Sequence, residues 1–301
     1  MGHFLKRPGF LLARVDQICT VIFGTLSEAP TLSQAEFLLL LDRVGPMIQI
    51  ALARAAGVDK STTAYILDNL QDRGWIERTV REHDRRSSLI SLTSEGQAIL
   101  PRVRRNFAEL QQRLEAPFRK GELAVLTEKL YHVGQNEQVP APLWRVACDP
   151  VSGVLDGSLS FLSRRALQML HAQFLKTAQA TRLTLRQFSL LFILSQRQSI
   201  TQTEFAQIFG VDPATCAVIM RAPARRGLID GMPCEKDRRA RNYTLTSAGW
   251  ALLKQVHPLV DQSEAIVFRR ESPDEIRVIV EYLHRIVAAY SHLLRFPGAI
   301  A

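Results

Sequence analysis

The chain contains the same stretch of sequence twice, and this duplication restricts its architecture more than any other feature. When the sequence is shifted by 153 positions, residues 32–96 align with residues 185–249 without a gap, and 23 of the 65 aligned positions are identical. Composition alone would produce roughly 4 identities. Two copies are too few for a solenoid. The sequence therefore predicts a pair of similar domains, which can form the two-fold arrangement that most soluble oligomers adopt.

A linker separates the two copies. Residues 138–157 contain three prolines and two glycines, which interrupt regular structure. At about 3.3 Å per residue, a segment of this length can span on the order of 66 Å. It is long enough to place one copy beside the other. We expect a first domain over residues 1–137, the linker over residues 138–157 and a second domain over residues 158–301.

Each copy begins with the pattern of a helical domain. In the first copy, apolar residues recur at helical spacing over residues 11–26, and Thr31 and Gln34 have the spacing of a capping box. A short amphipathic helix then ends at Gly57, which can adopt the left-handed C-cap conformation. Asp59 follows at an N-cap position. A helix, a short turn and a second helix are thus predicted, and the pattern recurs in the second copy.

The rest of each copy predicts a hairpin followed by long helices. In the first copy, β-prone runs at residues 75–80 and 89–92 flank a polar tip at residues 81–88. We expect the long helices at residues 94–115, 122–133, 247–270 and 273–294. The expected fold class is mainly α with small β-hairpin wings (α+β). Two winged helix-turn-helix domains would be joined by a helical region suited to dimerisation.

Composition restricts the partners and excludes several classes of function. The net charge of +9 and the pI of about 9.8 favour an anionic partner such as nucleic acid. The longest purely apolar runs, such as residues 37–41, are far shorter than the roughly 20 residues of a membrane span. We therefore expect a cytoplasmic protein with no membrane partner.

Neither a cofactor nor an enzymatic activity is expected. The four cysteines show no Cys-x-x-Cys spacing and no accompanying histidine pairs, so no metal site and no disulfide framework is predicted. The sequence also lacks a glycine-rich phosphate-binding motif and a nucleophile motif. These observations together argue against an enzyme.

Both copies resemble the multiple antibiotic resistance regulator (MarR) family of bacterial winged-helix repressors. An Asp-x-Arg at the wing tip, followed by a strand that ends in Leu-Thr-x-x-Gly, is a specific combination. The stretches that carry the resemblance are residues 56–78, 83–96, 209–230 and 236–249. The resemblance implies a dimerisation region made from terminal helices, a recognition helix in the major groove and a wing arginine in the minor groove.

The predicted recognition helices supply candidate DNA-binding residues. A helix N-terminus offers backbone N–H groups to phosphates, and hydroxyl and cationic side chains add contacts to phosphates and base edges. The alternative is that these hydroxyls only cap a surface helix. The candidates are Lys60, Ser61, Thr62, Thr63 and Tyr65 in the first copy, and Thr215 and Arg221 in the second.

The two wing tips carry the second set of candidates. Cations on a hairpin tip suit the narrow minor groove and its flanking phosphates, although a solvated charge cluster is the alternative. The cations are Arg85 and Arg86, with Arg238 and Arg239. The resemblance implies that Arg86 and Arg239 are inserted into the groove. It also implies that Asp84 and Asp237 orient the tips.

The two copies are not equivalent in sequence. Ala214 and Val218 stand in the second copy where the first has Ser61 and Tyr65. Pro223 replaces a leucine inside the second recognition helix, where it can remove a hydrogen bond and kink the helix. We therefore expect the second copy to read base identity less well.

The first helix resembles that of family members that sense aromatic acids or their thioesters. Arg14 could meet a carboxylate, although a surface arginine is the alternative. Ala13 and Asp16 stand where those members often carry a second arginine and a histidine. The helix also resembles organic hydroperoxide sensors, with Cys19 at the position of their reactive cysteine. The tyrosines of those sensors are absent, so Cys19 is alternatively a packed apolar residue.

The sequence thus predicts a DNA-binding transcription repressor. Its partners would be a double-stranded, imperfectly palindromic operator and a small-molecule effector, and one chain would act as its own dimer. The alternatives are a thiol-based repressor that uses Cys19 and a degenerate winged-helix adaptor without DNA binding.

Overall fold

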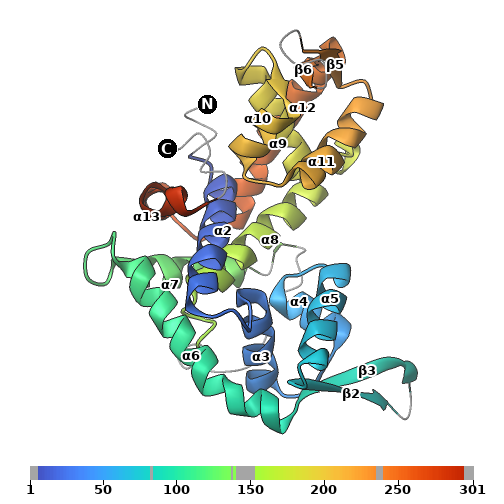
Figure 1. Ribbon diagram of the computed structural model, residues 1–301. Coiled ribbons are helices and arrows are strands. Elements are labelled where there is room, and N and C mark those ends of the chain that lie inside the picture. The colour runs from blue at the N-terminus through green and yellow to red at the C-terminus, as the bar shows by residue number, and fades with distance from the viewer. Residues whose placement is uncertain (1–5, 82–83, 137, 140–152, 235–239, 295–301) are drawn as a thin grey trace.

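The computed structural model describes residues 6–81, 84–136, 138–139, 153–234 and 240–294. The two repeats form two winged lobes on either side of a central helical region (Figure 1). In this view, the winged lobe of the first copy lies below the central helices and that of the second copy lies above them.

The first copy has the predicted order of elements. It contains helices α2 to α7 and one three-stranded antiparallel sheet of order β1-β3-β2. The elements are α2 (Pro8–Leu26), α3 (Leu32–Val44), β1 (Met47–Ile48), α4 (Gln49–Ala56), α5 (Lys60–Asp72), β2 (Ile76–Arg81), β3 (Asp84–Leu92), α6 (Ser94–Glu115) and α7 (Glu122–Gly134).

The second copy repeats this order, with a short 3-10 helix after its first helix. Its sheet has the equivalent order β4-β6-β5. The elements are α8 (Leu159–Thr177), η1 (Gln179–Thr181), α9 (Leu185–Gln196), β4 (Ile200–Thr201), α10 (Gln202–Phe209), α11 (Pro213–Arg225), β5 (Ile229–Pro233), β6 (Arg241–Leu245), α12 (Ser247–Val267), α13 (Pro273–Tyr290) and η2 (Ser291–Leu293).

The structure corrects the sequence-based expectations in three respects: the start of one strand, two short strands that were missed, and the ends of two helices. In the first wing, β3 begins at Asp84, so residues expected at a polar tip belong to a strand. The reason is that pairing with β2 extends to Arg81 opposite Asp84, past an irregularity at Val80 and Arg81. The short strands β1 and β4 were missed, because each has only two residues and is defined by pairing with a distant strand. The last two long helices are shorter than expected.

The Thr-x-x-Gly motif joins each hairpin to the long helix that follows it. Thr93 accepts a hydrogen bond from the Gly96 N–H at 3.0 Å and donates to the Gly74 carbonyl at 2.5 Å. A Cβ on Gly96 would lie 2.0 Å from the Trp75 carbonyl oxygen, so a larger residue does not fit. Thr246 and Gly249 repeat the arrangement in the second copy. The motif therefore sets the angle between each wing and its helix.

The terminal helices of each copy pack against the other copy. The first helices α2 and α8 contact each other extensively, α13 packs on α2, and α7 packs on α8. The packing of α7 and α13 on the opposite copy is therefore reciprocal. Ion pairs also connect the two copies. Examples are Arg7 with Glu264 at 3.0 Å and Lys129 with Glu275 at 2.7 Å. The hydrophobic core continues through this region from one copy to the other.

Helix α2 is at the centre of that core. Among the described helices, it alone is long and apolar enough, by length and composition, to cross a membrane. Most of its apolar side chains are buried, with Leu11, Val15 and Ile18 fully so, and the helix packs against α8, α13 and α6. A core helix of a folded protein has this environment.

Candidate nucleic-acid interface

The N-terminus of α5 is organised by Asp59. Its carboxylate accepts hydrogen bonds from the Ser61 hydroxyl at 2.5 Å, the Thr62 hydroxyl at 2.6 Å and the Thr62 N–H at 2.9 Å. These bonds, first that from Ser61 and then those from Thr62, lower the pKa of Asp59 below its ordinary value. The hydroxyls of Ser61 and Thr62 therefore donate to the cap. To the solvent they present oxygen lone pairs.

The exposed face of α5 contains most of the expected residues. Lys60, Ser61 and Thr62 are exposed, and Tyr65 has 71% of its surface exposed. Thr63 is different, because it is fully buried and its hydroxyl has no hydrogen-bond partner among the described residues. Thr63 therefore packs with Ile66 and the core, and its assignment to the DNA-facing set is corrected.

The second helix of this kind, α11, has the same length and a less polar face. Asp212 caps it by accepting from the Thr215 N–H at 2.9 Å and its hydroxyl at 2.6 Å. Val218 is 62% exposed at the position of Tyr65, and Arg221 is also exposed. Pro223 lies within the helix, as the sequence indicates. It lies in the last turn with its side chain buried, and α11 spans 13 residues, as α5 does.

The wing residues are described only in part. The backbone of Asp84, Arg85 and Arg86 belongs to β3, and their side chains lie outside the described part of the structure. Asp237, Arg238 and Arg239 lie entirely outside the described residues. The wing cations therefore stay sequence-based expectations.

Two side chains connect the central helices to the second helix-turn-helix. The Arg14 guanidinium donates to the Ile208 carbonyl at 3.2 Å, and the Gln17 amide donates to the Gly210 carbonyl at 2.8 Å. Arg14 also donates to the Gln17 side chain at 3.1 Å. These carbonyls end α10, and Asp212, the cap of α11, follows two residues later. A movement of Arg14 would therefore change the hydrogen bonds at the end of α10, next to the N-terminus of α11.

The first copy contains a corresponding Arg–Gln pair, but within the described residues the Nε and Nη2 of Arg165 have no hydrogen-bond partner, so Arg165 does not bond to the end of α4 as Arg14 does to the end of α10. Arg165 donates to Gln168 at 2.6 Å, and Gln168 lies beside Gly57, the end of α4. The pairs Arg14 with Gln17 and Arg165 with Gln168 are 151 positions apart, close to the offset of the main repeat. Sequence reasoning missed this Arg-x-x-Gln repeat, because the gapless alignment begins only at residue 32. A search of the first helices with a two-residue shift would have found it.

A cavity of about 80 Å³ lies beside Arg14, between the first helices and the second helix-turn-helix. Its wall is mostly apolar and aromatic, with Phe10, Phe188 and Phe209 among the lining residues. Arg14, Arg186 and His171 supply cationic or titratable groups, and Arg7 and Glu264 line the wall as an ion pair. Burial lowers the pKa of His171 to about 4, and the nearby charge of Arg186 adds to this shift. The lining therefore suits an apolar molecule with an anionic group.

The two candidate effector residues differ in their environments. Arg14 lines the cavity and is almost completely buried, so it is not the surface arginine of the alternative interpretation. Cys19 is fully buried and is not among the lining residues, and burial raises the pKa of its thiol well above the ordinary value. A redox-sensing cysteine needs an accessible thiolate. The environment of Cys19 is instead that of a packed apolar residue.

A helix-turn-helix with an exposed second helix, followed by a hairpin wing and present twice, defines the chain as a tandem winged helix-turn-helix protein of mainly α structure. The MarR family model matches residues 31–88 and again residues 183–240. The HTH-type transcriptional regulator PecS of Dickeya dadantii is 36% identical over 130 residues, which cover 42% of this chain and 78% of that protein. The chain belongs to the MarR family and carries its domain twice.

Other relatives cover one copy at a time. The HTH-type transcriptional repressor NicR of Pseudomonas putida is 33% identical over 97 residues, or 32% of this chain and 61% of that protein. The transcriptional repressor CouR, solved with a 23-mer DNA duplex, is 27% identical with a TM-score of 0.41, over 42% of this chain and 91% of that one. BpsR of Bordetella bronchiseptica is 31% identical with a TM-score of 0.38, over 41% of this chain and 88% of that one. The DNA binding of BpsR is regulated by 6-hydroxynicotinic acid.

Proposed function

We propose that this protein is a DNA-binding transcription repressor in which one chain supplies both lobes of a MarR-type dimer. The observation that carries the proposal is the presence of two capped, exposed recognition helices, α5 and α11, on one side of a shared helical core (Figure 1). The reciprocal packing of α7 and α13 on the opposite copy replaces the contact between two subunits. An imperfectly palindromic operator matches two similar but unequal reading helices.

The proposed release mechanism is binding of a small aromatic carboxylate in the cavity beside Arg14. Its carboxylate would form a charge-assisted pair with the Arg14 guanidinium, and its ring would pack among the phenylalanines of the wall. Arg14 would then exchange its hydrogen bond to the Ile208 carbonyl for one to the ligand. Because Ile208 lies at the end of α10, shortly before α11 begins, loss of this hydrogen bond would change the position of α11, the second recognition helix.

Fluorescence anisotropy with a labelled duplex from the region upstream of the protein's own gene tests DNA binding. If six or more phosphates are contacted, affinity should fall by orders of magnitude between about 50 and 200 mM salt. An affinity that stays flat across this range would contradict the proposal. It would favour an adaptor that keeps the fold for protein contacts.

The effector step is tested by adding benzoate to the DNA complex of the wild type and of Arg14→Met. Benzoate should weaken DNA binding by the wild type and should have little effect on the variant, because the variant lacks the guanidinium. Arg277→Met is the matched control, since Arg277 is exposed and pairs only with Asp274 on its own helix. An equal response of Arg14→Met and the wild type would rule out Arg14 as the contact.

A further inference from the structure

The ligand cavity of the second copy has a counterpart in the first, which the repeat defines residue by residue. Positions in α2 correspond to positions 151 residues later in α8, as Arg14 and Arg165 show. Positions in α3 and α6 correspond to positions 153 residues later in α9 and α12. By these offsets, the cavity-lining residues Ala13, Leu167 and Ser189 correspond to Arg164, Asp16 and Glu36.

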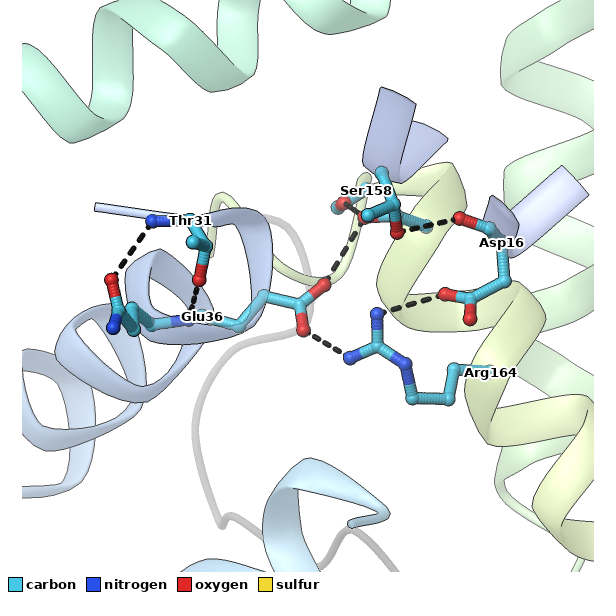
Figure 2. Close-up of polar contacts among 8 residues, drawn as sticks. Asp16, Thr31, Glu36, Ser158 and Arg164 are labelled. Atoms are coloured by element: carbon cyan, nitrogen blue, oxygen red, sulfur yellow. Dashed lines mark hydrogen bonds and ion pairs between the residues drawn. The ribbon is translucent and has the colours of Figure 1, made fainter. Parts of the chain in front are cut away.

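Those three counterparts form a buried ionic cluster (Figure 2). The Arg164 guanidinium lies between the carboxylates of Asp16 and Glu36, with Nη2 2.8 Å from Asp16 and Nη1 in direct contact with Glu36. Glu36 is completely buried, and only 14% of the Arg164 side chain is exposed. Three separate helices, α2, α3 and α8, each contribute one member. The cluster therefore joins the walls that surround an open space in the second copy.

Two further counterparts, Ser160 and Gln111, also make hydrogen bonds in this region. Ser160 corresponds to Gly9 of the cavity wall and donates to Glu36 at 3.2 Å. Gln111 corresponds to Glu264, and it contacts the Gly157 carbonyl and accepts from the Leu159 N–H at 3.4 Å. In the first copy, then, polar groups at pocket-lining positions bond to one another. At three of these positions the second copy has the smaller Gly9, Ala13 and Ser189, whereas its Phe188 and Phe209, which correspond to Ala35 and Ala56, form part of the cavity wall.

The charge of the cluster also opposes an anionic ligand. Burial lowers the pKa of Arg164, but the attraction of Asp16 and Glu36 outweighs this and raises it overall, so the guanidinium stays charged. Two carboxylates face this single cation. A ligand carboxylate that took Arg164 would leave a buried acid without its partner, which is strongly unfavourable.

We propose that the cluster of Arg164, Asp16 and Glu36 permanently fills the first-copy counterpart of the ligand cavity, so that each chain takes one aromatic carboxylate, in the second copy only. The inference rests on the proposed effector function. As a consequence, the two copies of one chain have different roles. The second helix-turn-helix responds to the effector directly, and in the first copy the equivalent space is filled by the side chains of Arg164, Asp16 and Glu36.

Exchange of the corresponding residues tests the inference. The opened variant, Asp16→Leu/Glu36→Ser/Arg164→Ala, places second-copy residues in the first copy. The filled variant, Ala13→Arg/Leu167→Asp/Ser189→Glu, places the cluster in the open cavity. The probe is 4-fluorobenzoate, and its stoichiometry is measured by calorimetry and by ¹⁹F NMR on full-length protein. We expect one equivalent for the wild type, two for the opened variant and none for the filled variant.

Other outcomes separate this inference from the effector proposal. Two equivalents on the wild type, or continued binding by a folded filled variant, would overturn it, and the wild-type result does not depend on any variant folding. A folded opened variant that stays at one equivalent would also overturn it while the effector proposal survives. If the wild type binds no probe, the effector proposal and this inference both fall, whatever the opened variant binds, because the inference requires one bound equivalent in the second copy.

Discussion

At the residue scale, His171 combines a position in the cavity wall with a strongly lowered pKa. Burial, together with the charge of Arg186, brings the pKa to about 4 from an ordinary 6.5. Between these values the unfolded chain binds a proton that the folded protein does not. The free energy of unfolding contributed by this group is therefore complete above pH 6.5 and falls as the pH drops toward 4, by at most about 3 kcal/mol.

This dependence can be isolated by comparison with His171→Gln, which keeps a polar side chain and does not titrate. Urea unfolding of both proteins between pH 7.5 and pH 4 should show a loss of stability for the wild type that exceeds that of the variant. Carboxylates titrate in both proteins and cancel in the difference. Parallel profiles would mean that His171 is protonated as easily in the folded protein as in the unfolded chain.

At the scale of single elements, the two recognition helices share one backbone geometry and differ in side-chain chemistry. Both are capped by an aspartate in the same way, and both span 13 residues. Tyr65 and Ser61 can hydrogen-bond to base edges, whereas Val218 and Ala214 offer only apolar contact, which is useful chiefly against thymine methyl groups. We therefore expect α5 to discriminate between bases better than α11.

We expect Ser61→Ala and Tyr65→Ala to relax base preference in one half-site, by about 1–3 kcal/mol for a good base contact. Val218→Ala is the matched control at the equivalent position and should change specificity little. The measurement is binding to a set of operators altered one base pair at a time. Equal discrimination by both half-sites, or a larger specificity loss from Val218→Ala, would show that the reading helix is misassigned.

At the scale of the whole molecule, the structure makes each copy depend on the other for the burial of its central helices. Helix α2 packs on α8 and α13, both from the second copy, and buries most of its apolar residues. The linker keeps the copies at an effective concentration near the millimolar range. The described end of the linker is held on α3 by the ion pair between Arg43 and Asp156 at 2.6 Å.

A fragment of residues 1–137 should therefore self-associate at micromolar concentration, because the surfaces of α2 and α7 that contact the second copy would be exposed to water. The full chain contains both partners and should stay a folded monomer at the same concentration. Analytical ultracentrifugation of the two proteins side by side measures this. A fragment that is a stable, folded monomer would show that the contact between copies is not required for folding.

Local features of the fold could be predicted from the sequence because they depend on neighbouring residues. The capping boxes at Thr31 and Thr184, the glycine helix ends at Gly57 and Gly210 and the aspartate caps all occur where the sequence predicts them. The internal repeat also predicted that there are two domains and that they are similar. These features were accessible because a cap or a turn involves only residues within one or two helical turns.

Features that depend on contacts between distant segments could not be predicted in the same way. The burial of Thr63, the position of Pro223 in a last turn and the extension of β3 to Asp84 are decided by what packs or pairs against them.

The sequence by itself determined that this protein is a duplicated winged helix-turn-helix chain whose two recognition helices carry different side chains. Only the tertiary structure decided that Arg14 faces a cavity, while Arg164, Asp16 and Glu36 fill the equivalent place in the other copy. The physical reason is that these groups come from separate helices, so the short distances between them, and the buried surroundings that strengthen the attraction between their charges, exist only once the chain has folded.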